Sequence, residues 1–324
     1  MIISNNIPQY NNNHYAVVDL GSNSFHLLIT LYKNNQIEST NKVKRKVRLA
    51  AGLNEENVLS EEAMNRGLDC LNLFAKHLAS IPLENIRIAA TATLRIAINS
   101  DDFITQANSI LPVKIKLLSG EQEANTIYSG VAHTSRGDLD QKRLVLDIGG
   151  ASTEIIVGQG PTASKAISLN LGCVSFKEKY FTDGLLNESN FTSAISAANN
   201  IITPVSVDFI KIGWQSVVGS SGTMQALAEI LTFRQQALVI TLDFLLEIKQ
   251  ALIHCKTIDR IANDNMTFAG LRADRSSVLA SGLSILIALF KCLAISEIKL
   301  STGALREGLL SEMLPNLGNI PAHD

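Results

Sequence analysis

Short apolar runs of strand length alternate with stretches of helical periodicity in the first part of the chain. Five runs are typical of strands: residues 15–20, 25–32, 42–49, 86–90 and 113–118. Three stretches between them space their apolar residues as helices do: one that begins after Ser60, and residues 102–111 and 121–131. Because strands alternate with helices, the pattern predicts an α/β fold.

The second part of the chain repeats the opening order of the first. The strand-like runs there are 144–146, 153–158, 166–171 and 216–218, and the helical stretches are 190–202 and 242–255. The apolar stretch 278–295 contains Lys291 and several Ser and Gly, so it predicts a buried helix and no membrane span. This order predicts a duplicated fold whose two halves meet near the charged stretch 133–142.

Two turns have the composition of phosphate-binding loops, and their leading residues Asp19 and Asp147 are 128 positions apart. Each turn follows an apolar run and continues with Gly, which lets the backbone approach an oxyanion closely. Small polar residues follow and offer donors without charge, while the leading Asp suits Mg²⁺ or a water bound to it. The predicted phosphate-binding residues are Gly21, Ser22, Asn23 and Ser24 in the first turn, and Gly149, Gly150, Ala151 and Ser152 in the second.

A third Gly-rich turn follows the strand-like run 216–218 and precedes a helical stretch. Its residues are Gly219, Ser220, Ser221, Gly222 and Thr223. A Gly/Ser turn that leads into a helix N-terminus offers backbone N–H donors to an anion. It is also a common strand–helix connection, but beside the two other turns we predict a third anion or nucleotide contact.

Two acids and one arginine are candidates for the chemistry itself. Glu121 and Glu123 lie at the start of a predicted helix, where acids stabilise the helix dipole. One of them can instead be a general base that activates water for phosphoanhydride hydrolysis. Arg95, at the start of another helix, can bind phosphate oxygens with both arms of its guanidinium.

Basic residues alternate with other residues along the run 42–49. Lys42, Lys44, Lys46 and Arg48 share one face of the predicted strand. The face is either a solvated basic edge or the lining of an anion-binding cleft, and both interpretations stay open.

Composition narrows the class of protein. The chain has 324 residues, 46% hydrophobic and 18% charged, which suits two globular domains. A net charge of -2 provides no global field that would attract nucleic acid. The four cysteines have no metal-binding or disulfide spacing, so they indicate reduced thiols in a cytoplasmic protein. The Asn-rich residues 1–14 lack the pattern of a signal peptide and are predicted to be disordered.

Together these motifs resemble the exopolyphosphatase/guanosine pentaphosphate phosphatase family of the actin-like ATPase superfamily. The resemblance covers residues 15–313 and is carried by DLGSNSFHLLI, ATATLRIAIN, SGEQEA, YSGVAHT, DIGGASTE, GSSGT and STGALREGLL. The stretches KRKVRLAAGLN and DIGGASTE are closer to the guanosine pentaphosphate phosphatase branch. Longer members continue beyond the position where this chain ends at Asp324, so dimer contacts are not carried over and a homodimer stays open.

The resemblance implies two ribonuclease-H-like domains that flank a cleft: domain I of residues 15–132 plus 303–316, and domain II of residues 133–302. It implies that Glu123, which directly precedes Ala in SGEQEA, is the catalytic base and that Glu121 has no fixed role. It also implies that Asp147 and Glu154 bind Mg²⁺, with Mn²⁺ as an alternative, and that Arg95 contacts phosphate.

The function that follows is removal of the terminal 5′ phosphate of guanosine pentaphosphate (pppGpp) to give ppGpp, with exopolyphosphatase activity beside it. One alternative is an enzyme that acts primarily on inorganic polyphosphate. A superfamily kinase is disfavoured because Glu stands where the family's hydrolases have it. An alarmone-binding sensor without turnover is disfavoured because the acid set Glu123, Asp147 and Glu154 is intact. Neither nucleic acid nor a membrane is expected as a partner.

Overall fold

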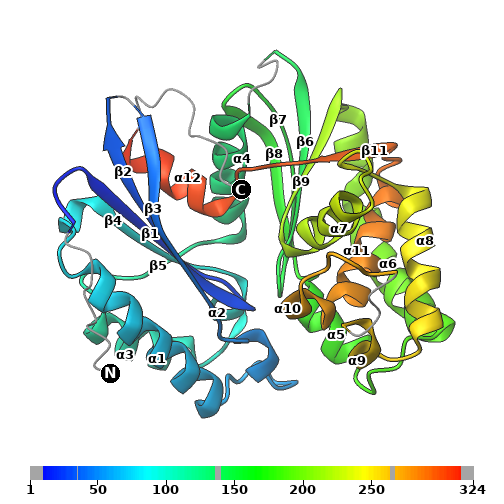
Figure 1. Cartoon of the computed structure of the whole chain (residues 1–324), viewed down its shortest axis with the longest axis horizontal. Helices are drawn as coiled ribbons and strands as arrows, with labels where there is room; N and C mark the ends of the chain where they lie inside the picture. The colour runs from blue at the N-terminus through cyan, green and yellow to red at the C-terminus, as the bar shows by residue number, and fades with distance from the viewer. Residues whose placement is uncertain (1–9, 35, 136–139, 263–266, 315–324) are drawn as a thin grey trace.

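The computed structural model describes residues 10–34, 36–135, 140–262 and 267–314 of the chain. Within them two mixed β-sheets stand side by side, with helices around and between them (Figure 1). The first sheet has the order β3-β2-β1-β4-β5. Its strands are β1 (His14–Leu20), β2 (Ser24–Lys33), β3 (Gln36–Lys46), β4 (Ile86–Ala90) and β5 (Lys116–Leu117).

The second sheet repeats the topology of the first and adds one edge strand. Its order is β10-β11-β9-β6-β7-β8. In both sheets the first strand pairs with an antiparallel hairpin on one side and with parallel strands on the other. The strands are β6 (Lys142–Ile148), β7 (Thr153–Gln159), β8 (Thr162–Leu169), β9 (Ser216–Ser220), β10 (Val239–Thr241) and β11 (Glu297–Leu300). The predicted duplicated α/β fold is therefore confirmed.

Helices cover the outer faces of both sheets (Figure 1). On the first half these are α1 (Glu61–Leu78), α2 (Ala92–Ile96) and α3 (Ser100–Ile110). The helices of the second half are α5 (Cys173–Tyr180), α6 (Glu188–Ile212), α7 (Gly222–Phe233), α8 (Leu242–Cys255), α9 (Ile258–Ile261), α10 (Ala273–Ser276) and α11 (Leu279–Cys292), and the short α10 lies beside the cleft. The helices α4 (Gly120–Thr134) and α12 (Leu305–Met313) lie between the two sheets.

Three groups of buried apolar side chains form the core. One lies in the first half, one in the second, and the third joins the two sheets through α4 and α12. In the joining group, Val17 of β1 and Val145 of β6 are both fully buried with Val131 of α4 and Leu309 of α12. Because the inner faces of both sheets bury apolar area against the same two helices, this layer holds the halves together.

Several predicted elements differ in length from the observed ones. Strand β3 ends at Lys46 because Arg48 adopts a φ of 54°, which a continuing strand does not allow. The strand predicted over 113–118 has only two residues, and the helix predicted over 190–202 continues to Ile212 through Pro204. The apolar stretch 278–295 forms the buried helix α11, as predicted.

The prediction of disorder over residues 1–14 is wrong for its last part. Tyr10 is buried, and its backbone N–H donates to Ser80 Oγ at 3.1 Å. His14 opens β1, while residues 1–9 of this prediction lie outside the described residues. The proposed domain boundary at 133 falls in the last turn of α4, and residues 315–316 of domain I are also outside the described part. The boundaries themselves stay predictions.

Helices α4 and α12 approach so closely that glycine is required at the contact. A Cβ added to Gly130 would lie 2.0 Å from the carbonyl oxygen of Ala304. A Cβ added to Gly308 would lie 1.9 Å from the carbonyl oxygen of Thr126. Both obstacles are backbone atoms, so a larger residue would push the helices apart.

We therefore expect Gly130→Ala to lower the free energy of unfolding by about 1–3 kcal/mol, because the added methyl group overpacks the joining layer. Chemical denaturation of the purified protein measures this change. Gly222→Ala is the matched control, since a Cβ there has nothing within 4 Å, and its effect should be much smaller. Equal stability of Gly130→Ala and the parent would show that the two helices can separate without cost.

Candidate active site

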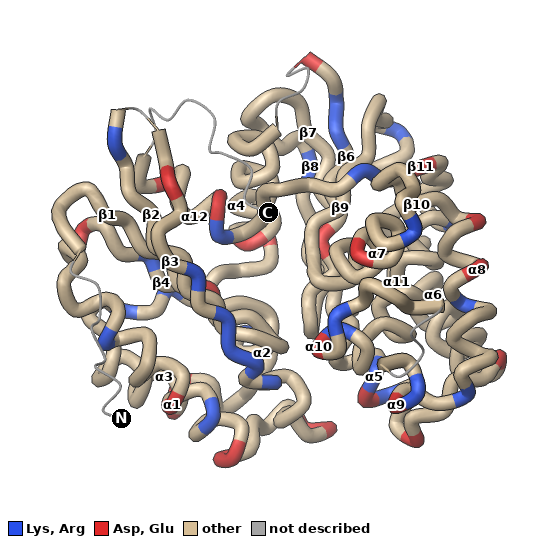
Figure 2. The backbone as a smooth tube through the Cα atoms, in the orientation of Figure 1, with Lys and Arg blue, Asp and Glu red and all other residues tan. Residues whose placement is uncertain are grey.

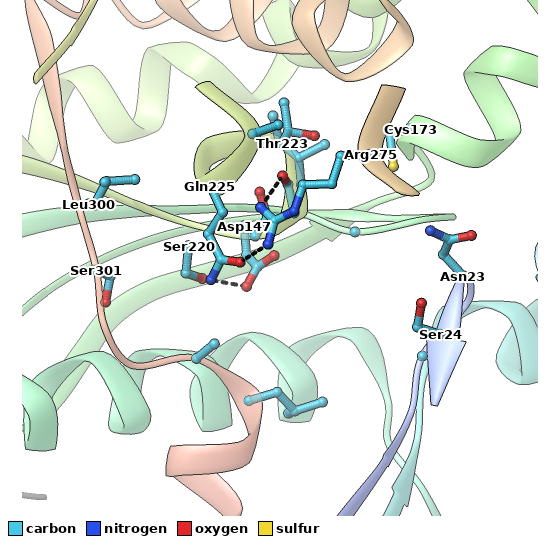
Figure 3. A pocket seen from close by; sticks show the side chains of 18 of the residues that line it. Asn23, Ser24, Asp147, Cys173, Ser220, Thr223, Gln225, Arg275, Leu300 and Ser301 are labelled. Atoms are coloured by element: carbon cyan, nitrogen blue, oxygen red, sulfur yellow. Dashed lines mark hydrogen bonds between the residues drawn. The ribbon is translucent and has the colours of Figure 1, made fainter. Parts of the chain in front are cut away.

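A cleft of about 1260 Å³ opens between the two sheets, and all three predicted loops reach it. Figure 3 shows Asn23 and Ser24 on one side of the cleft and Asp147 and Ser220 on the other. The predicted site residues that line the cleft are Gly21, Ser22, Asn23, Ser24, Glu123, Asp147, Gly149, Gly150, Ser152, Glu154, Ser220, Ser221, Gly222 and Thr223. The fold therefore brings together residues that are up to two hundred positions apart in the sequence.

The first two loops face each other across a narrow gap. A Cβ added to Gly150 would lie 2.8 Å from Ser22 Cβ and 3.2 Å from the backbone nitrogen of Asn23. The absence of a side chain at Gly150 thus leaves room for two strand-to-turn connections to approach one small volume. Such opposed turns can direct backbone N–H donors at a single anion.

Asp147 and Ser220 form the polar floor on the side of the second sheet. The two residues are register neighbours on the parallel strands β6 and β9, and Ser220 Oγ donates a short hydrogen bond to Asp147 Oδ2. Burial raises the pKa of the Asp147 carboxyl to about 7, and the Ser220 hydrogen bond opposes that rise. The carboxylates of Glu123 and Asp19 raise it further. The strand pairing therefore concentrates negative charge where water is scarce.

Glu123 lies in the first turn of α4 and points its carboxyl group into the cleft region. Ser119 caps this helix in a capping box with Gln122, so the helix start is well defined. Glu123 is 6% exposed, whereas Glu121 of the same turn is exposed to solvent. Burial raises the pKa of Glu123 to about 7, and the hydrogen bond and charge of Arg95 lower it. A carboxyl group with such a pKa can accept a proton near neutral pH.

Arg95 connects the acids of the two halves. Its Nη1 donates to Glu123 Oε2 at 2.9 Å and to the carbonyl oxygen of Leu118 at 2.9 Å. Its Nη2 donates to Ser168 Oγ at 3.3 Å, and Ser168 donates to Glu154 Oε1 at 2.7 Å. In this structure the Arg95 guanidinium therefore orients the Glu123 carboxylate. A contact between Arg95 and phosphate stays a prediction.

Three predicted residues do not line the cleft, and several residues outside the predicted phosphate-binding, metal and catalytic sets line it as well. Arg95 lies behind Glu123, Ala151 packs in the second core, and Gly219 contacts Met224. Among the additional lining residues are Asp19, His26 and Arg306. Asp19 leads the first turn, and its place on the cleft agrees with the role in metal or water binding that its motif predicts. Arg306 follows the Gly303 turn, and only the return of α12 to the first half places it there.

The acids of the cleft fit a divalent cation that also binds substrate oxygens. Glu154 is opposite Asp147 in the β6–β7 register and is 1% exposed, and burial raises its pKa well above the ordinary value. Asp19 Oδ1 is buried without a hydrogen-bond partner in the described structure. Among the described residues, no three His, Cys, Asp or Glu side chains are close enough to hold a metal by themselves. The site thus suits a hard divalent cation that is bound by one or two carboxylates and completes its shell with water and phosphate.

Curated bacterial proteins are similar to this chain over most of its length. A guanosine-5′-triphosphate,3′-diphosphate pyrophosphatase of Aliivibrio fischeri is 50% identical over 303 residues, which cover 94% of this chain and 60% of the relative. A protein of the same name from Vibrio cholerae is 50% identical over 306 residues, with 94% and 60% covered. The chain therefore spans about 60% of the length of the curated relatives it matches.

Solved structures show the same fold. A crystal structure of an exopolyphosphatase from Cytophaga hutchinsonii superposes with a TM-score of 0.83 at 23% identity, covering 94% of this chain and 98% of that one. A Ppx/GppA family member from Aquifex aeolicus superposes with a TM-score of 0.75 at 22% identity, covering 93% and 98%. The Ppx/GppA phosphatase family model matches residues 28–317. The two opposed loops, the buried acids and this match show that the chain belongs to the Ppx/GppA phosphatase family.

Proposed function

We propose that this protein is a phosphohydrolase that removes the terminal 5′ phosphate of pppGpp to give ppGpp, with exopolyphosphatase activity beside it. The curated relatives at 50% identity support the nucleotide substrate. The observation that carries the hydrolytic reaction is the position of Glu123, a buried acid that faces the cleft between two Gly-rich loops. Loops of this kind hold phosphate by backbone donors, and a nearby carboxylate can activate water.

In the proposed mechanism, both loops hold the terminal phosphate so that its scissile bond is in line with a water molecule. Glu123 accepts the proton of this water as the oxygen attacks phosphorus, and the nucleoside diphosphate end leaves. Arg95 keeps the Glu123 carboxylate in position through its 2.9 Å hydrogen bond. Because Glu123 returns its proton to solvent after each turnover, no nucleophilic Ser or Cys is needed.

We propose that Asp147 and Glu154 hold Mg²⁺, with Mn²⁺ as the alternative, and that Asp19 supports them. When bound, such an ion neutralises charge that develops on the phosphate oxygens. The protein's own part is to keep these acids desolvated, which strengthens their attraction for a cation. The raised pKa values of Asp147 and Glu154 have the same physical origin.

Two alternatives differ in substrate and in turnover. An exopolyphosphatase would use the same loops and the same base on inorganic polyphosphate, so only relative rates on the two substrates separate it from the proposal. An alarmone-binding sensor would bind without releasing phosphate. The buried acids disfavour the sensor, because three desolvated carboxylates beside a polyanion site would weaken simple anion binding.

We also propose that the protein works in the cytoplasm and needs neither nucleic acid nor a membrane as a partner. The net charge of -2 and the four free cysteines support this proposal. Among the helices that the structure describes, none is both long and apolar enough to cross a bilayer. A homodimer stays open.

The first functional prediction concerns the base. Glu123→Gln should lower kcat on pppGpp by about 10²–10⁴-fold, because an amide of the same shape cannot accept the proton of water. Binding of ppGpp should be nearly unchanged. In the parent, kcat/KM should fall below pH 7, since protonation of Glu123 removes the base and its pKa is about 7.

The control for this variant is Glu121→Gln. Glu121 lies in the same helical turn as Glu123, but it is exposed to solvent. Its kcat should be close to that of the parent in the same phosphate-release assay. An inactive Glu121→Gln beside an active Glu123→Gln would assign the base to the other acid.

The second functional prediction concerns the metal. Asp147→Asn should lower phosphate release by about 10²-fold or more at ordinary Mg²⁺ concentrations, because a neutral amide binds a hard cation poorly. The melting temperature of the metal-free variant should not fall, because the change removes a desolvated charge. The parent should gain thermal stability when Mg²⁺ is added and the variant should not; full turnover in excess chelator would rule out a metal role.

The third functional prediction concerns the basic residues of β3, which Figure 2 shows as a run along that strand. Lys44 Nζ lies 3.4 Å from Asp274 Oδ2, and Lys46 Nζ donates to the Asp274 carbonyl oxygen at 2.6 Å, so both lysines reach the opposite side of the cleft. The double variant Lys44→Gln, Lys46→Gln should raise KM several-fold for pppGpp and less for short polyphosphate.

The reason is that pppGpp carries phosphates at both ends of its ribose and needs cations beyond the loops. Added salt should reduce the difference in KM. Lys33→Gln, at the exposed far end of β2, is the matched control and should change neither KM. Equal effects on both substrates would make β3 a general attractor of anions.

A further inference from the structure

We propose that Phe233, at the C-terminal end of α7, is the platform on which the purine base of a nucleotide substrate stacks. This inference rests on the proposed function, because it deepens the description of the same cleft. Phe233 is 60% exposed and lines the cleft, as does Leu238, which is 47% exposed. An aromatic ring left in water inside a concave site is unusual, since aromatic side chains gain most when they are covered.

Helix α7 presents one continuous face to the cleft. The lining residues Gly222, Gln225, Ala226, Glu229, Thr232 and Phe233 recur at the spacing of a single helical face, and Thr223 and Ala228 line the cleft beside it. The face begins at the third Gly-rich loop and ends at Phe233, eleven residues later, which corresponds to about 16 Å along the helix axis. This length is comparable with an extended nucleoside triphosphate, from terminal phosphate to base.

The character of the wall changes along this face. Near the loops, Arg275 runs beside the helix: its Nη1 donates to the carbonyl oxygen of Gly222 at 3.1 Å and its Nη2 to Gln225 Oε1 at 2.6 Å. This part is polar and cationic and suits phosphates and a ribose. At the far end Phe233 and Leu238 add exposed apolar area to a wall that also carries Glu229 and Arg272. Inorganic phosphate chains have no group that gains from an apolar surface.

The backbone behind Phe233 is held in place by a close approach. Gly270 has a φ of 88°, and a Cβ added there would lie 2.7 Å from Phe233 Cβ and 2.8 Å from the carbonyl oxygen of Glu229. Glu229, one turn before Phe233, is already engaged, because its Oε2 accepts the backbone N–H of Arg272 at 3.1 Å. The ring is therefore held at this end of the cleft as an exposed flat surface that a ligand can cover.

The test compares binding of ppGpp and of tripolyphosphate to the parent and to Phe233→Ala by calorimetry. Stacking of a base on an aromatic side chain is lost in the variant, so the Kd for ppGpp should rise about 5- to 100-fold. The Kd for tripolyphosphate should not change. Phe233→Trp should restore binding of ppGpp, whereas Phe233→Leu, which keeps apolar area without a ring, should restore it only in part.

Ile210→Ala is the matched control, because Ile210 is 47% exposed on α6 and does not line the cleft. Unchanged melting temperatures would show that all variants are folded. Equal weakening of both ligands, or unchanged binding of ppGpp, would overturn the platform. If the parent released phosphate from polyphosphate and not from pppGpp, the proposed substrate would be wrong, yet the ppGpp binding comparison would still decide the role of Phe233.

Discussion

The layer formed by α4 and α12 between the two sheets is the constraint on which the rest of this structure depends. The backbones of the two helices approach closely at Gly130 and Gly308, so the helices cannot come nearer to each other and no larger side chain fits between them. On the other side, the Tyr128 hydroxyl of α4 donates to the carbonyl oxygen of Gly160 at 3.2 Å. Because α4 is held from both sides, the first turn that carries Glu123 has a single position relative to both sheets.

The site is assembled at a cost in stability. Asp147, Glu154 and Glu123 are buried, and their raised pKa values show that their charged forms are disfavoured by the lack of water. Arg95 offsets part of this for Glu123, but the other two acids rely on hydroxyl donors such as Ser220 and Ser168. The stability needed to hold such a site comes from the apolar layers around it. A cation and a phosphate then meet groups that are already desolvated and oriented.

The groups proposed for phosphate chemistry and those proposed for substrate recognition lie in different parts of the cleft. The loops and the acids line the same cleft between the two sheets, and any terminal phosphate bound there would meet the same groups. The far end carries the exposed side chains of Phe233, at the end of α7, and of Leu238 beyond it. The basic residues of β3 lie on the opposite wall, where Lys44 approaches Asp274. In this arrangement, the recognition of a nucleotide that we propose would lie in the outer cleft.

Much of the site could be predicted from the sequence because its parts are local. An apolar strand that ends in a Gly turn indicates both a local structure and a capacity to bind anions. Asp147, Gly149 and Gly150, which this pattern predicts as site residues, do line the cleft. The choice between Glu121 and Glu123 came from family resemblance, and the structure adds the physical difference that only Glu123 is buried. The stop of β3 at Lys46 was missed, because the positive φ of Arg48 has no signal in its residue type.

The sequence by itself determined the alternation of strands and helices, their duplication, and the three Gly-rich turns, because these follow from residue type and spacing along the chain. Tertiary structure alone decided which side chains meet: Arg95 with Glu123, Asp147 with Ser220, and α12 with α4. These contacts join residues far apart in the chain, and their pairing depends on how two sheets pack against shared helices. Burial decided the rest, since the packed cleft excludes water and this exclusion raises the pKa of Glu123 and Asp147.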